Sequence, residues 1–418
     1  ASQASMQNWK VTKTIDTAVR LGIPYIGIVD SGGIRIQEGF GVMAGKAVSI
    51  KADTWLAPAL ANGVVPSVTA LLGSSFAGTA YSPMLADVFF MVDKPYCYMS
   101  LSSPELLKAV TFADVTRAEI AAPRMHAEVS GSCDYLAETE EELLQKVKEL
   151  LSFLPSSCRE KPHLVDTGDD PGRRDDALLD IVPSDTMQVY DMHEVIRRLV
   201  DNGSFLQLKR EYAKNIITGF ARLGGYSVGT GPQLATIELL ELDRGAAEKE
   251  ARFIRYCDAY NVPLIFLVDT PGFVVDPKQE REGLARHASM VMYAICEATV
   301  PKITVYVRRC YKEGYCAMGT RLMGVDMVLA WPSAQIQQVE FNNAVEAVYH
   351  KRPEDMEPTE LEEFSKKYFD SPHQPGALLM LDDIIDPRQT RPILIDALEI
   401  TANKKEERPW KKIGNIPC

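Results

Sequence analysis

Two stretches of the chain end alike, IPYIGIVDSGG at Ile23–Gly33 and VPLIFLVDTPGF at Val262–Phe273. Each is an apolar run that ends in an aspartate followed by a glycine-bearing turn, and Asp30 and Asp269 lie 239 residues apart. A nearly constant spacing over several segments predicts that the chain contains two copies of one unit. Other pairs with a similar spacing are Pro66 with Pro301, Gly78 with Gly314, and Asp87 with Asp326.

The repeated unit alternates helical stretches with short, continuous apolar strands rich in Val, Ile and Leu. Such strands are typical of a largely parallel sheet that is buried on both faces. The alternation of strand and helix therefore predicts an α/β fold. We expect a first domain over residues 1–160, a linker over residues 161–185, which are rich in Pro, Gly and charge, and a second domain over residues 186–418.

Composition and charge exclude several classes of function. The 418 residues carry a net charge of −12, which argues against a general nucleic-acid binder, because phosphate backbones require a basic face. None of the eight cysteines forms a CxxC motif and no His-x-x-x-His pair is present, so we expect no metal site. Scattered, apolar-flanked cysteines are typical of reduced core residues in an intracellular protein.

One stretch raises the question of a membrane span. Asn62–Ala86 is uncharged and long enough to cross a bilayer, but it contains Pro66, Gly73, Gly78 and Pro83. These residues would make a poor spanning helix, so we interpret the stretch as a buried strand, a turn and a buried helix. No N-terminal signal peptide is visible, and we expect a cytoplasmic protein without membrane insertion.

Two catalytic motifs are only partly met. The VDTPG sequence at Val268–Gly272 is similar to a GTPase motif, but the GxxxxGK[ST] phosphate loop is missing. The GSSFAG sequence at Gly73–Gly78 suggests a hydrolase with Ser75 as nucleophile and His126 as base, yet GxSxG is not fulfilled. Neither motif favours these enzyme classes.

The turns after the second apolar strand of each copy are more informative. They contain FAGTAY in the first copy and YKEGYCAM in the second. A strand-to-helix turn with small residues exposes main-chain N–H groups, and the helix N-terminus adds positive potential. Two such turns at equivalent positions predict a pair of oxyanion-binding sites for two carbonyl groups. No general base is evident beside either turn.

Several segments resemble one family, the carboxyltransferase components of biotin-dependent acyl-CoA carboxylases. The resemblance covers essentially the whole chain. It implies two tandem crotonase-like (ClpP/crotonase) domains of the ββα-superhelix type. The segments that carry it are DSGGIRIQEGF at 30–40, YAKNIITGFARLGGYSVG at 212–229, ARFIRYCDAYNVPLIFLVDTPGF at 251–273, QEREGLARHASMVMYAICEATVPKITV at 279–305 and the tail KKIGNIPC.

The resemblance also implies a reaction, in which a carboxyl group moves from carboxybiotin to the α-carbon of a short acyl-CoA through an enolate. Gly78, with Ala77 or Thr79 beside it, would face the ureido oxygen of biotin. Glu313 and Gly314 would donate main-chain N–H groups to the thioester oxygen. The residues expected to bind substrate, with Cys316 at a position associated with the choice of acyl chain, are Gly32, Gly33, Arg35, Pro271, Gly272, Phe273, Tyr315 and Cys316.

The sequence departs from the family pattern at three places. Lys312, Glu313 and Gly314 stand where relatives have Gly-Gly-Ala, and the first copy has only Gly78 where relatives have two glycines. Lost glycines restrict a turn, and a carboxylate beside a developing enolate would oppose it. The chain also starts at Ala1 inside a family segment, so we expect the first domain to be incomplete at its start.

The sequence lacks a Met-Lys-Met biotin attachment motif, so biotin would arrive on a separate carrier protein. By resemblance, the partners would be a biotin carboxyl carrier protein and a biotin carboxylase subunit. The chain itself would form a homohexamer, located in the mitochondrial matrix if the source is a eukaryote. Two alternatives stay open: a biotin-dependent decarboxylase subunit of the glutaconyl-CoA type and a noncatalytic scaffold paralogue. A crotonase-type hydratase would need a pair of catalytic carboxylates that we cannot place.

Overall fold

The computed structural model describes residues 4–33, 35, 55–186, 188–230, 241–337, 339, 341–369 and 380–417. The chain divides into two compact units. The first comprises Ala1–Pro162, Leu208–Tyr212 and Ala259–Asn261, and the second comprises His163–Gln207, Ala213–Asp258 and Val262–Cys418. Most of the expected linker, 161–185, thus belongs to the second unit; the exact domain boundaries stay a prediction.

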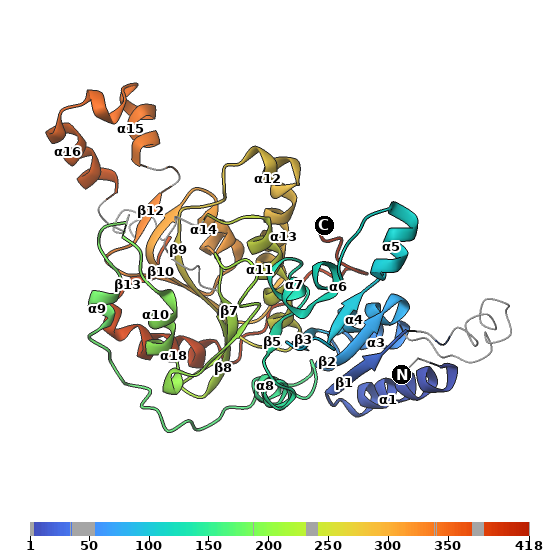
Figure 1. Cartoon of the computed structure of the whole chain (residues 1–418). Coiled ribbons are helices and arrows are strands. Elements are labelled where there is room, and N and C mark those ends of the chain that lie inside the picture. Colours follow the sequence, from blue (N-terminus) through green and yellow to red (C-terminus); the bar gives the residue numbers. More distant parts are fainter. Residues whose placement is uncertain are drawn as a thin grey trace. The chain divides into compact units, whose positions relative to one another are not determined.

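The first unit contains a parallel sheet in the order β1-β2-β3-β5, with β4 also paired to β2 (Figure 1). Its strands are β1 (Tyr25–Ser31), β2 (Ser67–Phe76), β3 (Val88–Val92), β4 (Tyr98–Ser100) and β5 (Tyr135–Ala137). The longer strands β2 and β3 are largely buried, as their apolar sequences predict. Its helical segments are α1 (Ser5–Leu21), α3 (Leu56–Ala61), η1 (Ala77–Ala80), α4 (Tyr81–Leu85), α5 (Pro104–Thr111), α6 (Arg117–Ala121), α7 (Pro123–Glu128) and α8 (Glu140–Ser152).

The second unit is built around a larger sheet in the order β13-β11-β10-β9-β8-β7-β6, with β12 paired to β10. The pairs of β9, β10, β11 and β13 are parallel, whereas β7 and β8 form an antiparallel pair. Its strands are β6 (Phe205–Leu208), β7 (Thr218–Leu223), β8 (Tyr226–Thr230), β9 (Leu264–Thr270), β10 (Lys302–Tyr311), β11 (Met327–Ala330), β12 (Gln335–Gln337) and β13 (Asp383–Ile384).

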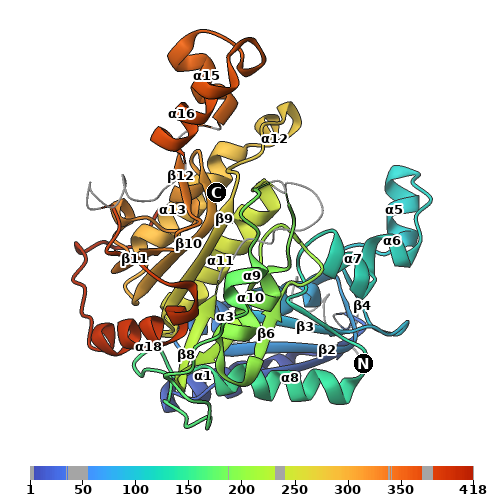
Figure 2. The same cartoon turned by 90° about the vertical axis from the view of Figure 1, so that its left-hand side faces the viewer.

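The helices of the second unit pack on this sheet or extend from it. In both views α15 and α16 lie beyond the edge of the sheet (Figures 1 and 2), and they share a small core of Ala344, Val345, Phe364 and Phe369. The helical segments are α9 (Leu178–Ile181), α10 (Met192–Leu199), η2 (Asp201–Gly203), α11 (Arg244–Ala259), α12 (Pro277–Arg281), α13 (Leu284–Glu297), α14 (Gly314–Ala317), η3 (Arg321–Met323), α15 (Phe341–Tyr349), η4 (Pro353–Asp355), α16 (Pro358–Tyr368), η5 (Pro387–Gln389) and α18 (Thr390–Thr401).

The strand registers confirm the internal duplication. Tyr25 pairs with Ser67 in the first unit, and Leu264 pairs with Lys302 at the equivalent position of the second. Both ladders then shift at the same place, so that Ser31 pairs with Ser75 and Thr270 pairs with Cys310. The two copies therefore share the same irregularity near the carboxyl ends of their strands.

Aspartates at the start of the long strands repeat at equivalent places as well; Asp87 is buried and Asp326 is partly buried. Asp87 accepts a hydrogen bond from the main-chain N–H of Ser67 at 2.9 Å, and Asp326 accepts one from Lys302 at 2.8 Å. Each carboxylate thus satisfies the first N–H of the long strand in its unit, where no ladder partner is available. Asp87 also accepts hydrogen bonds from the Ser67 hydroxyl and from the Tyr260 hydroxyl, at 2.8 and 2.6 Å.

The uncharged stretch 62–86 contains β2, η1 and α4 of the first unit, in agreement with the expected strand, turn and helix. Among the described helices, none combines the length and the hydrophobicity that a bilayer-spanning segment needs.

We expect Asp87→Ala to destabilise the first unit by about 2–4 kcal/mol, because it leaves several buried donors without an acceptor. Thermal unfolding followed by circular dichroism measures the change. Asp93→Ala is the control: Asp93 pairs at 2.6 Å with the largely exposed Arg124, and its loss should cost less than about 1 kcal/mol. Equal losses for the two variants would contradict a special role of the strand-capping carboxylate.

Candidate functional site

The two aspartates of the repeated motif perform the same structural task. Asp30 accepts a hydrogen bond from the main-chain N–H of Ser74 at 3.1 Å, and Asp269 accepts one from Arg309 at 3.0 Å. Both residues lie where the ladder with the first strand of the unit shifts, so the carboxylate takes the place of a main-chain acceptor on that side. The aspartates therefore fix the course of β2 and β10 just before these strands end.

The second unit reinforces this contact with charge. Asp269 is fully buried, and its carboxylate binds the guanidinium groups of Arg308 at 2.9 Å and Arg309 at 2.7 Å. Burial by itself would raise the pKa of Asp269, but the two arginines hold it below its ordinary value. Arg308 also donates to the main-chain oxygens of Asp185 and Gln188, at 3.0 and 2.8 Å.

The loop after each first strand also repeats. The N–H of Gly33 binds the Ser31 hydroxyl at 3.3 Å, and the N–H of Gly272 binds the Thr270 hydroxyl at 3.0 Å. Both glycines have a positive φ, 107° for Gly33 and 104° for Gly272, which few other residues adopt. Since these N–H groups are already engaged, we do not assign them to an oxyanion.

The turns after β2 and β10 share a left-handed residue. Ala77 has φ 53° and Lys312 has φ 51°, and each directly follows the last residue of its strand. Ala77 is therefore equivalent to Lys312, and Gly78 to Glu313. The pairing of Gly78 with Gly314 that the sequence suggested is wrong by one residue, because backbone conformation, and not the glycines, defines the turn.

The second turn packs tightly against the VDTPG loop. A Cβ atom on Gly314 would lie 2.7 Å from the Cα of Gly272 and 2.9 Å from the Cγ2 of Thr270. Such contacts leave no space for a side chain at position 314. The structure thus brings together the predicted site residues Gly272 and Gly314, which lie far apart in the sequence.

The N–H groups of Glu313 and Gly314, at the start of α14, are the candidates for the predicted oxyanion site. The first N–H groups of a helix have no intrahelical acceptor, and in the part of the chain that the structure describes no acceptor is assigned to the N–H of Glu313 or Gly314. The Glu313 side chain is exposed, and Lys312 forms an ion pair with Glu241 at 3.3 Å. The positions of the Lys312 and Glu313 side chains are therefore compatible with main-chain N–H groups of Glu313 and Gly314 that are free to bind an oxyanion.

The first turn is arranged similarly. Gly78 follows the left-handed Ala77, and its main-chain oxygen accepts a hydrogen bond from the Trp55 indole at 3.4 Å. The buried Thr79 hydroxyl donates to the main-chain oxygen of Phe76 at 2.7 Å, so it is used within the turn.

The other predicted substrate-binding residues lie in varied surroundings. Gly32 and Arg35 are exposed, and residues 36–40 of the same motif lie outside the described residues. Pro271 is buried, and Phe273 forms a bridge with Leu242. Burial raises the pKa of the partly buried Cys316 thiol, as does the nearby Glu313, so this thiol is protonated at neutral pH.

The structure gives no support to the hydrolase interpretation. The Ser75 hydroxyl donates to Thr79 at 3.2 Å. The two ring nitrogens of His126 are engaged with Ser130 at 3.1 Å and with the main-chain oxygen of Met99 at 2.7 Å. Ser75 and His126 therefore do not form a nucleophile–base pair.

Sequence reasoning missed the buried Asp269–Arg308–Arg309 cluster. The available signal was a pair of arginines within an otherwise apolar strand, since buried charges are usually paired. It also missed the equivalence of Ala77 and Lys312, which only backbone conformation reveals.

Comparison with known proteins identifies the family of this chain. The family described as "Carboxyl transferase domain" matches residues 2–416. This chain belongs to the carboxyl transferase domain family. The transcarboxylase 12S crystal structure with methylmalonyl-coenzyme A and methylmalonic acid bound superimposes with a TM-score of 0.94 at 38% identity, covering 100% of this chain and 80% of that one. The predicted fold of tandem crotonase-like domains is thereby confirmed.

Two relatives illustrate the range of the family. The methylmalonyl-CoA decarboxylase subunit alpha of Veillonella parvula is 39% identical over 100% of this chain and 80% of the relative. The methylmalonyl-CoA carboxyltransferase 12S subunit of Propionibacterium freudenreichii subsp. shermanii is 38% identical over 100% of this chain and 79% of the relative. A relative named as a carboxyltransferase and one named as a decarboxylase thus have nearly the same sequence identity to this carboxyl transferase domain.

We expect Asp269→Asn to destabilise the second unit by about 3–5 kcal/mol, because it leaves two buried arginines without a carboxylate. The difference from wild type should also depend on pH. Because the folded state lowers the pKa of Asp269, its contribution is complete above about pH 4 and is lost as the pH falls further. Melting temperatures between pH 7 and pH 3 measure this; a gap that widens toward acid would contradict the assignment.

The left-handed conformation of Ala77 and Lys312 leads to a second prediction. Ala77→Gly and Lys312→Gly should change stability by less than about 1 kcal/mol, because relief of left-handed strain offsets the greater freedom of the unfolded chain. Ala80→Gly, in the same turn but with φ −69°, should be destabilising by about 1 kcal/mol or more. Melting temperatures compare the three variants, and equal losses at Ala77 and Ala80 would argue against the left-handed turn.

Proposed function

We propose that this chain is a biotin-dependent acyl-CoA carboxyltransferase, which moves a carboxyl group between biotin and the α-carbon of an acyl-CoA. The observation that carries the proposal is the duplicated strand-to-helix turn, with a left-handed residue at Ala77 and at Lys312. Two substrates, each with a carbonyl oxygen that gains charge during the reaction, require two such sites. The relatives named as carboxyltransferase and the solved 12S structure with methylmalonyl-CoA support it.

Main-chain N–H groups carry out the catalytic task in this proposal. Carboxybiotin, when bound, supplies the carboxyl group. The N–H groups of Glu313 and Gly314 would hold the thioester oxygen and lower the energy of the enolate as negative charge develops there. The turn at Gly78 would hold the ureido oxygen. Bound biotin would supply the acceptor for the α-proton at its ureido nitrogen, so the site would need no side-chain base. This agrees with the separate hydrogen bonds of Ser75 and His126, which do not form a nucleophile–base pair.

The unusual Lys312 and Glu313 are compatible with an active site. A residue other than proline can donate its main-chain N–H, and Lys312 adopts the left-handed conformation that this turn requires. The exposed Glu313 carboxylate stays hydrated, so its repulsion of a developing oxyanion is screened. These features argue for a catalytic subunit over a noncatalytic scaffold.

A second candidate is a biotin-dependent acyl-CoA decarboxylase subunit, which uses the same site in the opposite direction. The similarity to the Veillonella parvula methylmalonyl-CoA decarboxylase subunit favours it. Both functions require a biotin carrier as partner. By analogy with the hexamer assembly described for transcarboxylase 12S, we propose that this chain also forms a homohexamer.

The test uses the full chain with free biotin and malonyl-, methylmalonyl- or glutaconyl-CoA, and mass spectrometry to follow biotin-dependent loss of the carboxyl group. Turnover of malonyl- or methylmalonyl-CoA supports carboxyl transfer to biotin, the step that a carboxyltransferase and a methylmalonyl-CoA decarboxylase subunit share. Carboxylation of propionyl-CoA by N-carboxybiotin in the reverse assay then favours the carboxyltransferase. Turnover of glutaconyl-CoA alone favours the decarboxylase. If CoA esters bind without turnover, the chain is a noncatalytic paralogue and the proposal is overturned.

In the same assay we expect Gly314→Ala to lower kcat by about 100-fold, because a methyl group at this position must displace the turn that carries the N–H donors. Gly27→Ala is the matched control, since its added Cβ would meet only the Thr69 hydroxyl at 3.6 Å. The control should keep kcat within threefold of wild type. Unchanged kcat in Gly314→Ala would show that this turn takes no part in the reaction.

A further inference from the structure

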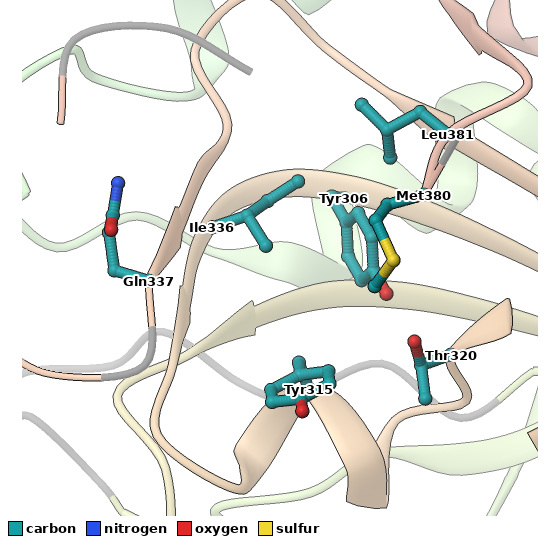
Figure 3. A pocket seen from close by; sticks show the side chains of 7 residues that line it. All are labelled: Tyr306, Tyr315, Thr320, Ile336, Gln337, Met380 and Leu381. Carbon is teal, nitrogen blue, oxygen red and sulfur yellow. The ribbon is translucent and has the colours of Figure 1, made fainter. Parts of the chain in front are cut away.

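A pocket of about 140 Å³ opens beside the second turn. Figure 3 shows its lining: the ring of Tyr306 rises from β10, Tyr315 from α14, and Ile336 from β12. The rest of the lining consists of Thr320, Gln337, Met380 and Leu381.

The pocket wall touches both ends of the proposed oxyanion turn. Tyr315 directly follows Gly314 in the chain, and the main-chain oxygen of Gln337 accepts the N–H of Lys312 at 3.0 Å. A thioester whose oxygen binds the N–H groups of Glu313 and Gly314 therefore lies next to this pocket.

The lining indicates the chemistry of the group that fits. None of the seven lining residues is charged, and most contribute apolar or aromatic surface. A carboxylate entering the pocket would lose its hydration without gaining a cation. The volume is similar to that of an engineered cavity that binds benzene, which is about 150 Å³. A compact, uncharged group of about four to six carbon atoms fits this description better than the short chain of propionate.

We propose that this pocket receives the acyl chain of the substrate and selects compact, uncharged acyl groups larger than propionyl, including branched ones. The inference rests on the proposed function, because it places the thioester oxygen at the second turn. The transferred carboxyl group attaches to the α-carbon, next to the thioester, and so stays outside the pocket. Acyl groups with a carboxylate at the far end, such as glutaryl, are disfavoured.

The experiment compares isovaleryl-, propionyl- and glutaryl-CoA as acceptors, with N-carboxybiotin as donor. Burial of two further carbon atoms strengthens binding by about tenfold. We therefore expect kcat/KM to be about tenfold higher for isovaleryl-CoA than for propionyl-CoA, and to be lowest for glutaryl-CoA. Ile336→Trp fills the pocket and should lower kcat/KM for isovaleryl-CoA at least tenfold, while propionyl-CoA changes less than threefold. Leu322→Trp, at an exposed position of the same unit, should change neither.

Other outcomes overturn the inference. A preference of the wild type for propionyl- or glutaryl-CoA contradicts it directly. A second contrary result is that Ile336→Trp lowers kcat/KM equally for all three acyl-CoA acceptors and raises the KM for carboxybiotin. That result would show that the pocket holds the biotin ring. Ile336→Phe provides a milder filling if Ile336→Trp does not fold.

Failure of the proposed function is distinguishable from failure of the pocket. If no acyl-CoA is carboxylated, calorimetry can compare the binding of isovaleryl-CoA and propionyl-CoA to the same variants. A tenfold difference in Kd that disappears in Ile336→Trp supports the pocket without the reaction. Equal Kd values in the wild type overturn it.

Discussion

In each copy of the repeated unit, a main-chain N–H of the long strand donates a hydrogen bond to the carboxylate at the end of the neighbouring strand, and this contact organises the unit. Asp30 holds the N–H of Ser74, and Asp269 holds that of Arg309, where both parallel ladders shift. At the buried Asp269, loss of the carboxylate would leave the N–H of Arg309 without a partner inside the protein, at a cost of about 1–3 kcal/mol. The Asp30 contact is exposed to solvent, so water can replace that carboxylate at a lower cost. The long strand ends only a few residues later, so the same contact determines where the following turn lies.

The two copies stabilise this contact in different ways. In the first copy, the missing side chain of Gly73 leaves space for the carboxylate of Asp30. A Cβ atom on Gly73 would lie 2.2 Å from the Oδ1 atom of Asp30. In the second, arginines surround the buried Asp269 and supply charge. The duplicated backbone geometry has thus persisted while the side chains that support it diverged.

In the proposed function, catalysis by main-chain N–H groups would explain how such divergence is compatible with activity. Lys312 and Glu313 change the side chains of the turn, but the N–H donors depend on the backbone, which Gly314 holds against the Gly272 loop. Selectivity can then reside in a separate set of side chains, those of the neighbouring uncharged pocket. Within the proposed function, reaction chemistry and choice of substrate are carried by different parts of the second unit.

Apolar strands and strand-end aspartates repeat at nearly constant spacing, and this was enough to predict the duplication, the α/β class and the approximate position of both turns. The same spacing misaligned the turns by one residue, since the left-handed conformation of Ala77 and Lys312 has no signature in residue type. The close approach of Gly314 to Gly272, the charge cluster at Asp269 and the pocket beside Tyr315 also depended on the tertiary structure. These features arise between residues distant in the chain, where sequence periodicity carries no information on contact.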